Sequence, residues 1–316
     1  MLGWITAAES NDVPTMSRLV AAGGVEINDS PPGRNTATAL HYAARDGASD
    51  AVEWLLGKGA SQAAVSQTGE PPLHWAVIGG HLTVVERLAS HQNASLEAAD
   101  RDGLTALHLA VINGRGHPRA KLALVRCLLA AGARADGAAD NQGDTALHNA
   151  CLRGSHSIAE LLLRRGASPL RANDAGDTPL HTVARYGGAE RRRIAALLLR
   201  WGADPEARRR RDERGGGGET AAQIADNAPH GVLADGDGIG MAAVHAAHAE
   251  AVGLLAARQL LAWGRCTLRD PRGATVDAAA LPFDLQELLG LLARRRQSER
   301  LPQCALLRRW QDSAEL

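Results

Sequence analysis

The sequence has few aromatic residues, no long apolar run and no excess of charge of either sign. Phe, Trp and Tyr make up 3% of the 316 residues, whereas Ala, Leu and Gly abound. The interior must therefore be built from small and medium aliphatic side chains, which suits closely stacked helices. No stretch approaches the roughly 18 apolar residues that a membrane span needs, and residues 1–16 lack the pattern of a signal peptide. We expect a soluble protein of the cytoplasm, with the nucleus as the alternative, and no association with membranes.

Charge and cysteine content exclude further classes of protein. The 35 basic and 35 acidic residues balance, so the excess of positive charge expected of a nucleic-acid binder is missing, and nucleic acid is not the expected partner. The four cysteines lie far apart and form no C-x-x-C pair, which argues against a zinc ribbon and against a disulfide-stapled secreted module. We expect a reducing compartment, no bound metal and no cofactor.

What the sequence does contain is a motif repeated five times. TALHLAVINGRG, which begins at Thr105, has near copies in TALHYAARDGAS, PPLHWAVIGGHL, TALHNACLRGSH and TPLHTVARYGGA. The leucines of the motif are separated by 33, 34, 40 and 33 residues; they are Leu40, Leu73, Leu107, Leu147 and Leu180. A nearly fixed period in this range is typical of a stacked array of small units rather than of one globular core.

Each copy carries the start and stop signals of two short helices. A threonine such as Thr145 stands where an N-cap hydroxyl can accept a hydrogen bond, and a proline such as Pro179 occupies the first helical position. A glycine such as Gly154 follows at the expected end of the helix. A second helix with paired apolar residues comes next, for example IAELLL at 158–163, and stretches such as ADNQGD then supply Asp, Asn and Gly for a tight turn.

This pattern resembles the ankyrin repeat family, whose signature combines a TPLHxA helix start, a central glycine, a leucine-rich second helix, a GA dipeptide and a D-x-x-G loop. The resemblance covers roughly residues 36–206, with five copies close to consensus. It implies an all-α solenoid of stacked helix-turn-helix units with protruding hairpin-like loops. It also implies that the concave surface of the array binds other proteins.

The flanks match the repeat less closely. Residues 1–35 are expected to form a degenerate N-terminal capping repeat, because a terminal unit exposes one side to water and departs from consensus. An Arg- and Gly-rich loop insertion is expected at 207–218. A degenerate last repeat is expected at 219–273, interrupted by an insertion at 228–241, and a helical C-terminal tail at 274–316.

The repeated histidines have two interpretations, structural or catalytic. They are His41, His74, His108, His148 and His181. Each follows its helix start by three residues, so each can hydrogen-bond with the threonine or backbone there, and in ankyrin repeats this histidine is architectural. A thiol-imidazole site at Cys151, or a metal site at His245 and His248, is the competing hypothesis. No nucleotide-binding, esterase or metalloprotease motif is present, so we expect no enzyme.

Ten residues are candidates for contacts with a protein partner. They occupy first-helix positions that the repeat pattern leaves free of packing, and they include both tyrosines of the chain. They are Tyr42, Arg45, Trp75, Ile78, Leu109, Ile112, Leu152, Arg153, Arg185 and Tyr186. Aromatic, aliphatic and arginine side chains are the usual anchors of interfaces, although such residues can also simply cover neighbouring helices. The set suggests a partner with an apolar ridge and an acidic end.

The run RRRRDERGGGG, beginning at Arg208, has three interpretations. It can be a solvated loop, a nuclear-import signal, or a contact with nucleic acid or an acidic protein. Its acidic neighbours make its phosphate-binding power modest.

The C-terminal tail has both a structural and a functional interpretation. In LPFDLQELLGLL, leucines at helical spacing form an apolar stripe that can cap the last repeat. The same letters followed by LLRRW resemble a short F-box, and with the preceding VGLLAARQLLAW they resemble a SOCS box. Both resemblances imply an adaptor that ties residues 250–312 to cullin-type ubiquitin ligase components. We therefore expect a non-enzymatic scaffold for a protein partner, with a substrate-recruiting ubiquitin-ligase adaptor as the alternative.

Overall fold

The computed structural model describes residues 2–31, 36–91, 94–112, 118–186, 189–209, 218–221 and 223–224. Within these ranges the chain forms twelve α-helices and no strand. The helices are α1 (Leu2–Glu9), α2 (Val13–Ala21), α3 (Ala39–Asp46), α4 (Ser49–Gly57), α5 (Pro72–Gly79), α6 (Leu82–Ser90), α7 (Ala106–Ile112), α8 (Pro118–Ala130), α9 (Ala146–Leu152), α10 (His156–Arg164), α11 (Pro179–Tyr186) and α12 (Ala189–Arg200). The predicted insertion at 228–241 and the predicted tail at 274–316 lie outside the described residues.

The predicted helix signals act where the sequence places them. Thr145 caps α9: its side chain accepts a hydrogen bond from the backbone N–H of His148 at 3.4 Å. Pro72 opens α5 at the first helical position. Gly47 and Gly80 end α3 and α5 in the left-handed conformation, with φ of 77° and 81°. These local signals set the lengths of the helices before any packing is considered.

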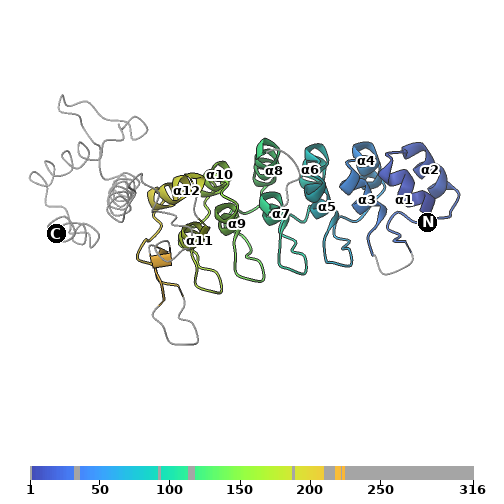
Figure 1. Ribbon diagram of the computed structural model, residues 1–316. Helices are drawn as coiled ribbons and strands as arrows, with labels where there is room; N and C mark the ends of the chain where they lie inside the picture. The colour runs from blue at the N-terminus through green and yellow to red at the C-terminus, as the bar shows by residue number, and fades with distance from the viewer. Residues whose placement is uncertain are drawn as a thin grey trace, which may run out of the picture.

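The helices form two layers in a single row, in chain order from α1 to α12 (Figure 1). The first helices of the units, α1, α3, α5, α7, α9 and α11, pack each against the next, and so do the second helices, α2, α4, α6, α8, α10 and α12. Loops between the units project together beside the first helices. The prediction of an all-α solenoid is confirmed.

The core is continuous and aliphatic. Leu88 of α6, Leu128 of α8 and Leu162 of α10 are 0% exposed, and alanines such as Ala76 allow the helices to approach closely. Burial of one such leucine contributes about 1.5–3 kcal/mol. The largest fully buried side chain, Trp4, lies at the N-terminal end. Each helix pair therefore depends on its neighbours for most of its apolar contacts.

The projecting loops are joined to one another by backbone hydrogen bonds. Arg101 N–H donates to Thr68 O at 3.1 Å, Asn141 N–H to Asp102 O at 3.0 Å, and Asp174 N–H to Gln142 O at 3.0 Å. Gly143 shows why a glycine stands at the loop tip: its φ is +78°, and a Cβ there would lie 2.6 Å from the backbone nitrogen of Asp174. The loops are thus part of the stack and hold a fixed surface beside the first helices.

Candidate protein-binding surface

The repeated histidines join one unit to the next. In His148, Nδ1 accepts from the backbone N–H of Thr145 at 3.2 Å, and Nε2 lies 3.0 Å from the carbonyl oxygen of Asp177 in the following loop. His41 makes the same link to the carbonyl of Glu70 at 3.1 Å, and His108 to that of Asp144 at 3.2 Å. This arrangement requires a neutral ring with its proton on Nε2.

Burial keeps these rings neutral. Loss of hydration on burial lowers the pKa of His41 to about 4, and burial likewise lowers the pKa of the other four motif histidines. The rings lie in five successive units and do not converge on one cleft. The architectural interpretation of these histidines accounts for every contact that they make.

The structure gives no support to a thiol-imidazole site. Cys151 is 0% exposed, and burial raises the pKa of its thiol. Both ring nitrogens of His148 already have partners. Among the described residues no cluster of three or more His, Cys, Asp or Glu side chains could hold a metal ion. His245 and His248 lie outside the described residues.

Three of the candidate contact residues meet at one place on α3 and α5. The rings of Tyr42 and Trp75 pack edge to face, with centroids 5.5 Å apart and an interplanar angle of 81°. The guanidinium of Arg45 lies 5.2 Å from the Tyr42 centroid and 5.7 Å from that of Trp75. We call Tyr42, Arg45 and Trp75 the aromatic corner.

Carboxylates surround the aromatic corner. Arg45 forms ion pairs with Glu9 of α1 and Asp46 of α3, each at 2.9 Å. The indole N–H of Trp75 donates to Glu70 at 2.8 Å. Glu9 and Glu70 were not among the candidates, although Glu70 stands at the same place before a helix start as Asp144 and Asp177. Acidic groups therefore outnumber the one cation here.

The expectation that every candidate is free of packing is wrong for Leu109, which is only 2% exposed. Leu109 directly follows the motif histidine, as Tyr42, Trp75 and Asn149 do in their own repeats. Asn149 at this position is also buried, at 5% exposure, whereas Thr182 is half-buried. The larger rings of Tyr42 and Trp75 stay half-buried. Ile78, Ile112 and Leu152 are half-buried as well.

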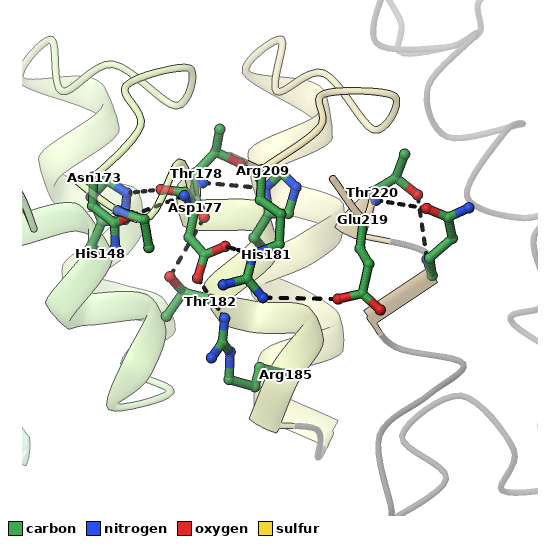
Figure 2. Close-up of polar contacts among 12 residues, drawn as sticks. His148, Asn173, Asp177, Thr178, His181, Thr182, Arg185, Arg209, Glu219 and Thr220 are labelled. Atoms are coloured by element: carbon green, nitrogen blue, oxygen red, sulfur yellow. Dashed lines mark hydrogen bonds and ion pairs between the residues drawn. The ribbon is translucent and has the colours of Figure 1, made fainter. Parts of the chain in front are cut away.

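A second charged cluster lies around Asp177, just before the start of α11 (Figure 2). The Asp177 side chain is 9% exposed and lies between two arginines, with Arg185 at 2.5 Å and Arg209 at 3.3 Å. The guanidinium of Arg209 also lies 3.8 Å from the Glu219 carboxylate, and the backbone N–H of Arg209 donates to the backbone carbonyl of Glu219 at 3.1 Å. We call Asp177, Arg185 and Arg209 the arginine cluster. Arg185 was expected as a contact residue, whereas the role of Asp177 and Arg209 was missed.

The remaining candidates of the later repeats are open to solvent. Tyr186 is 50% exposed and lies under the guanidinium of Arg191, 5.6 Å from the ring centroid. Arg191 also donates to the carbonyl of Leu152 at 2.7 Å, which ties α12 to α9. Arg153 is exposed and forms no ion pair within the described part of the chain.

Comparison with protein families agrees with this architecture. The model described as ankyrin repeats in three copies matches residues 40–136 and 117–209, and the model of ankyrin repeats in many copies matches residues 5–56. The chain belongs to the ankyrin repeat family. It therefore carries an ankyrin-repeat protein-interaction domain, a fold that generally serves as a non-enzymatic scaffold.

Similar curated proteins share the ankyrin array. The chain is 35% identical over 170 residues to the ankyrin repeat protein nuc-2 of Neurospora crassa, a match that covers 54% of this chain and 15% of nuc-2. It is 37% identical over 240 residues to the ankyrin repeat and SOCS box protein 16 of Mus musculus, with 64% of this chain and 52% of that protein covered. The match to the NF-kappa-B p105 subunit of Gallus gallus is 32% identical over 171 residues and covers 53% of this chain and 16% of p105. The ankyrin array thus spans about half or less of these relatives.

Solved ankyrin domains superpose on the array. The ankyrin repeat domain of Bcl-3 covers 71% of this chain with a TM-score of 0.59 and 27% identity, and 93% of that domain is matched. The human ASB11 ankyrin repeat domain covers 73% with a TM-score of 0.55 and 26% identity, and 96% of it is matched. None of the described helices has the length and apolarity required to cross a membrane.

Proposed function

We propose that this ankyrin array is a non-enzymatic scaffold that binds a protein partner through one face. That face consists of the outward sides of α1, α3, α5, α7, α9 and α11 together with the loop tips, and we call it the first-helix face. The ankyrin resemblance predicts that it is concave. The observation that carries the proposal is the aromatic corner, because a solvated helix face usually presents Lys, Glu and Gln rather than paired rings.

The candidate residues suggest how a partner would be held. Trp75, Ile78 and Ile112 offer half-buried apolar surface on successive first helices, and Arg153 offers a cation toward the later repeats. Leu109 is not part of this surface because it is buried. Half-buried aromatic and aliphatic groups surrounded by charges make typical interface anchors.

The experiment is to replace Trp75 and, separately, Ile112 by Ser in the full chain and to measure the affinity for a protein that co-purifies with the native chain. We expect each substitution to weaken binding about tenfold or more while the helical circular-dichroism spectrum is unchanged. Leu161→Ser on α10 is the control, because Leu161 is a partly buried aliphatic residue of a second helix. Unchanged affinity in Trp75→Ser and Ile112→Ser would show that another face binds.

A substrate-recruiting adaptor of a cullin-type ubiquitin ligase is the second candidate function. It is supported by the SOCS-box resemblance of residues 250–312 and by the match to ankyrin repeat and SOCS box protein 16. Here the array would bind the substrate and the tail would bind the ligase. Affinity purification of the full chain and of a variant that ends at Arg272 separates the two functions. Cullin or its linker proteins, found only with the full chain, would favour the adaptor, and their absence from both would count against it.

The proposed location is the cytoplasm, with nuclear entry through the arginine run as the alternative. The first two arginines of the run already have structural contacts: Arg208 donates to the carbonyl of Gly218 at 3.0 Å, and Arg209 pairs with Asp177. Replacing Arg210 and Arg211 by Ala in a fluorescent fusion tests the alternative. A nuclear signal that persists after this double substitution would exclude the run as the import signal.

A further inference from the structure

The second helices of the later repeats carry an excess of basic side chains. In α8, α10 and α12 there are eight basic and two acidic side chains, a net charge of +6. In α2, α4 and α6 there are two basic and three acidic side chains, a net charge of −1. The second helices form the layer of the row that lies away from the projecting loops (Figure 1). The near-zero charge of the whole chain therefore conceals a basic region on this side of the later repeats.

Four arginines of this region have no carboxylate partner. They are exposed, and none of them forms an ion pair with a described residue. They are Arg126 on α8, Arg134 four residues after α8, Arg165 directly after α10 and Arg200 at the end of α12. We call these four residues the basic patch. Unpaired guanidinium groups on successive helices attract an anionic partner.

The two acidic side chains of α8, α10 and α12 do not neutralise the basic patch. Glu160 pairs with Arg164, one turn along α10, at 2.7 Å. Glu190 pairs with Arg193 on α12 at 3.0 Å. The four arginines of the patch are additional to both pairs.

The basic patch ends at α8, and acidic residues occupy the same register on the helices before it. Arg126 stands two residues before the buried Leu128, and Glu86 on α6 stands two residues before the buried Leu88. Glu53 occupies this position on α4. All three charged side chains are exposed. A long polyanion that followed the row of second helices would therefore meet carboxylates beyond α8.

A surface hollow lies between two members of the basic patch. Its volume is about 360 Å³, and it is lined by residues 132–136, which follow α8, and by the end of α10. Arg134 borders it from the first segment and Arg165 from the second. The hollow is therefore flanked by two arginines that have no carboxylate partner.

The carboxylates near the hollow are already engaged. Asp136 lines the hollow, and its side chain accepts from the backbone N–H of Ser168 at 3.2 Å and lies 4.0 Å from Arg171. Glu97 accepts from the backbone N–H of Arg134 at 2.8 Å, and it forms no ion pair with the guanidinium of that residue. The two arginines at the hollow thus remain open to a further acidic group.

We infer that the second-helix side of α8, α10 and α12 binds an acidic protein segment, with one of its carboxylates in the hollow between Arg134 and Arg165. Further carboxylates of the segment would lie at Arg126 and Arg200. The planar guanidinium matches the geometry of a carboxylate, and complementary charge fixes where the segment docks. This surface lies in the layer behind the first-helix face. It gives the array a second binding surface and does not rest on the proposed scaffold function.

The length of the acidic segment follows from helix packing. Neighbouring helices pack about 8–10 Å apart, so α8 and α12 are separated by roughly 16–20 Å. An extended chain rises about 3.3 Å per residue, so about six residues span this distance. Alternate side chains of an extended chain point to the same side, which places their carboxylates roughly 7 Å apart. A short run of alternating acidic residues therefore reaches all three helices.

A protein segment fits the basic patch better than a nucleic acid or a membrane does. Among the described residues the exposed large apolar side chains are Val65, Leu170 and Tyr186, and none of them lies on α8, α10 or α12. Proteins that bind single-stranded nucleic acid stack bases on exposed aromatic rings, and helices that bind membranes bury large apolar side chains. An acidic protein segment requires neither feature.

The test uses the full chain and two labelled peptides of ten residues. In the first peptide Glu and Ser alternate; in the second, Gln replaces every Glu, which keeps the size and removes the charge. We expect the Glu peptide to bind at least tenfold tighter by fluorescence anisotropy at about 50 mM salt. Screening should reduce this preference below threefold at about 500 mM salt.

Matched substitutions locate the site. Arg134→Glu and Arg165→Glu should each weaken binding of the Glu peptide at least fivefold, and Arg165→Gln should weaken it less than Arg165→Glu. Arg18→Glu is the control, because Arg18 is an exposed arginine of the second helix α2 and has no ion pair with a described residue. It makes the same change of charge and should alter affinity less than twofold. Unchanged circular-dichroism spectra verify that the variants fold.

Five outcomes would overturn the inference. Equal affinity for the two peptides, or no binding of either, would show that the patch does not recognise carboxylates. Equal losses in Arg18→Glu and Arg165→Glu would show that only the net charge matters. Ten-nucleotide single-stranded DNA bound as tightly as the Glu peptide would identify a general polyanion site. Displacement of the Glu peptide by phosphatidylcholine vesicles with about 30% phosphatidylserine would identify a membrane surface. Self-association that Arg165→Glu abolishes would identify a second copy of the chain as the occupant.

Discussion

The aromatic corner and the arginine cluster occupy similar places in different repeats, yet they are built from opposite charges. At the aromatic corner Arg45 is held by two carboxylates, and at the arginine cluster Asp177 is held by two arginines. Inside the stack the same two regions are nearly identical: His41 and His148 each link a helix start to the next loop. The interior of the repeat is therefore constrained by stacking, whereas the outward positions differ from one repeat to the next.

If the histidine links of the two regions are equivalent, acid should lower the stability of both regions together. This is the largest effect that we expect. The pKa of His41 falls from 6.5 in the unfolded chain to about 4 in the folded one. Its contribution is complete above pH 6.5 and is lost as the pH falls toward 4, because the unfolded state then binds the extra proton. The loss reaches about 3 kcal/mol for this residue alone.

Urea unfolding at pH 7, 5.5 and 4 measures the acid effect. Hydrogen exchange of the loops at 58–71 and 165–178 shows whether both regions respond. In His41→Gln the pH dependence should be smaller than in the native chain. An unchanged dependence would mean that the carboxylates, and not the buried imidazoles, govern stability in acid.

Leu88→Ala on α6 and Leu162→Ala on α10 compare the cores of the two regions. Both leucines are 0% exposed and occupy the same position of the second helix. Each substitution should lower the free energy of unfolding by about 2–5 kcal/mol, and the two values should agree within about 1 kcal/mol. Urea denaturation followed by circular dichroism provides both values. A much smaller effect in one variant would show that this region is less tightly coupled to the stack.

His148→Ala should lower the free energy of unfolding more than His74→Ala. The pair compares two of the histidine links directly. His148 has partners at both ring nitrogens, whereas His74 follows Pro71 instead of a threonine and its Nδ1 has no partner among the described residues. We expect a difference of about 1 kcal/mol in unfolding free energy, the value of one buried hydrogen bond. Equal losses would show that packing of the ring, rather than its hydrogen bonds, determines its contribution.

The smallest effects concern the surface arginines. Arg185→Ala removes a partner from Asp177, whose side chain is 9% exposed. It should lower the free energy of unfolding by about 1 kcal/mol. Arg153→Ala removes no ion pair and should stay within about 0.5 kcal/mol of the native value. Thermal unfolding of both variants measures the difference. An equal loss in Arg153→Ala would point to a contact of Arg153 with residues other than those described.

The regular part of the molecule could be predicted from the sequence because its signals are local. The cap at Thr145, the proline at Pro72 and the glycine at Gly47 act within one helical turn, and each appears where predicted. The architectural role of the histidines, as hydrogen-bond partners of the helix start, was predicted as well, whereas their contact with the following unit was not.

The candidate surface was predictable only in part, because exposure depends on neighbours that a single repeat does not reveal. At the position after the motif histidine, Leu109 is buried while Trp75 and Thr182 are half-buried, so the neighbouring helices decide the exposure. Arg185 was expected to contact a partner, but in the structure its guanidinium donates a hydrogen bond to Asp177 of the same chain. Asp177, like Glu70 and Asp144, is an acidic residue directly before a helix start. This recurrence is the sequence signal that could have identified Asp177 as part of the charged cluster.

By itself the sequence determined the repeat, the ends of the helices and the order of the units, because capping, glycine conformation and apolar periodicity operate over a few residues. The tertiary structure decided which side chains reach the surface and which charges meet. Those outcomes depend on the packing of one unit against the next: Arg45 meets Glu9, 36 positions away in the sequence, and Asp177 meets Arg209, 32 positions away, only in the folded stack.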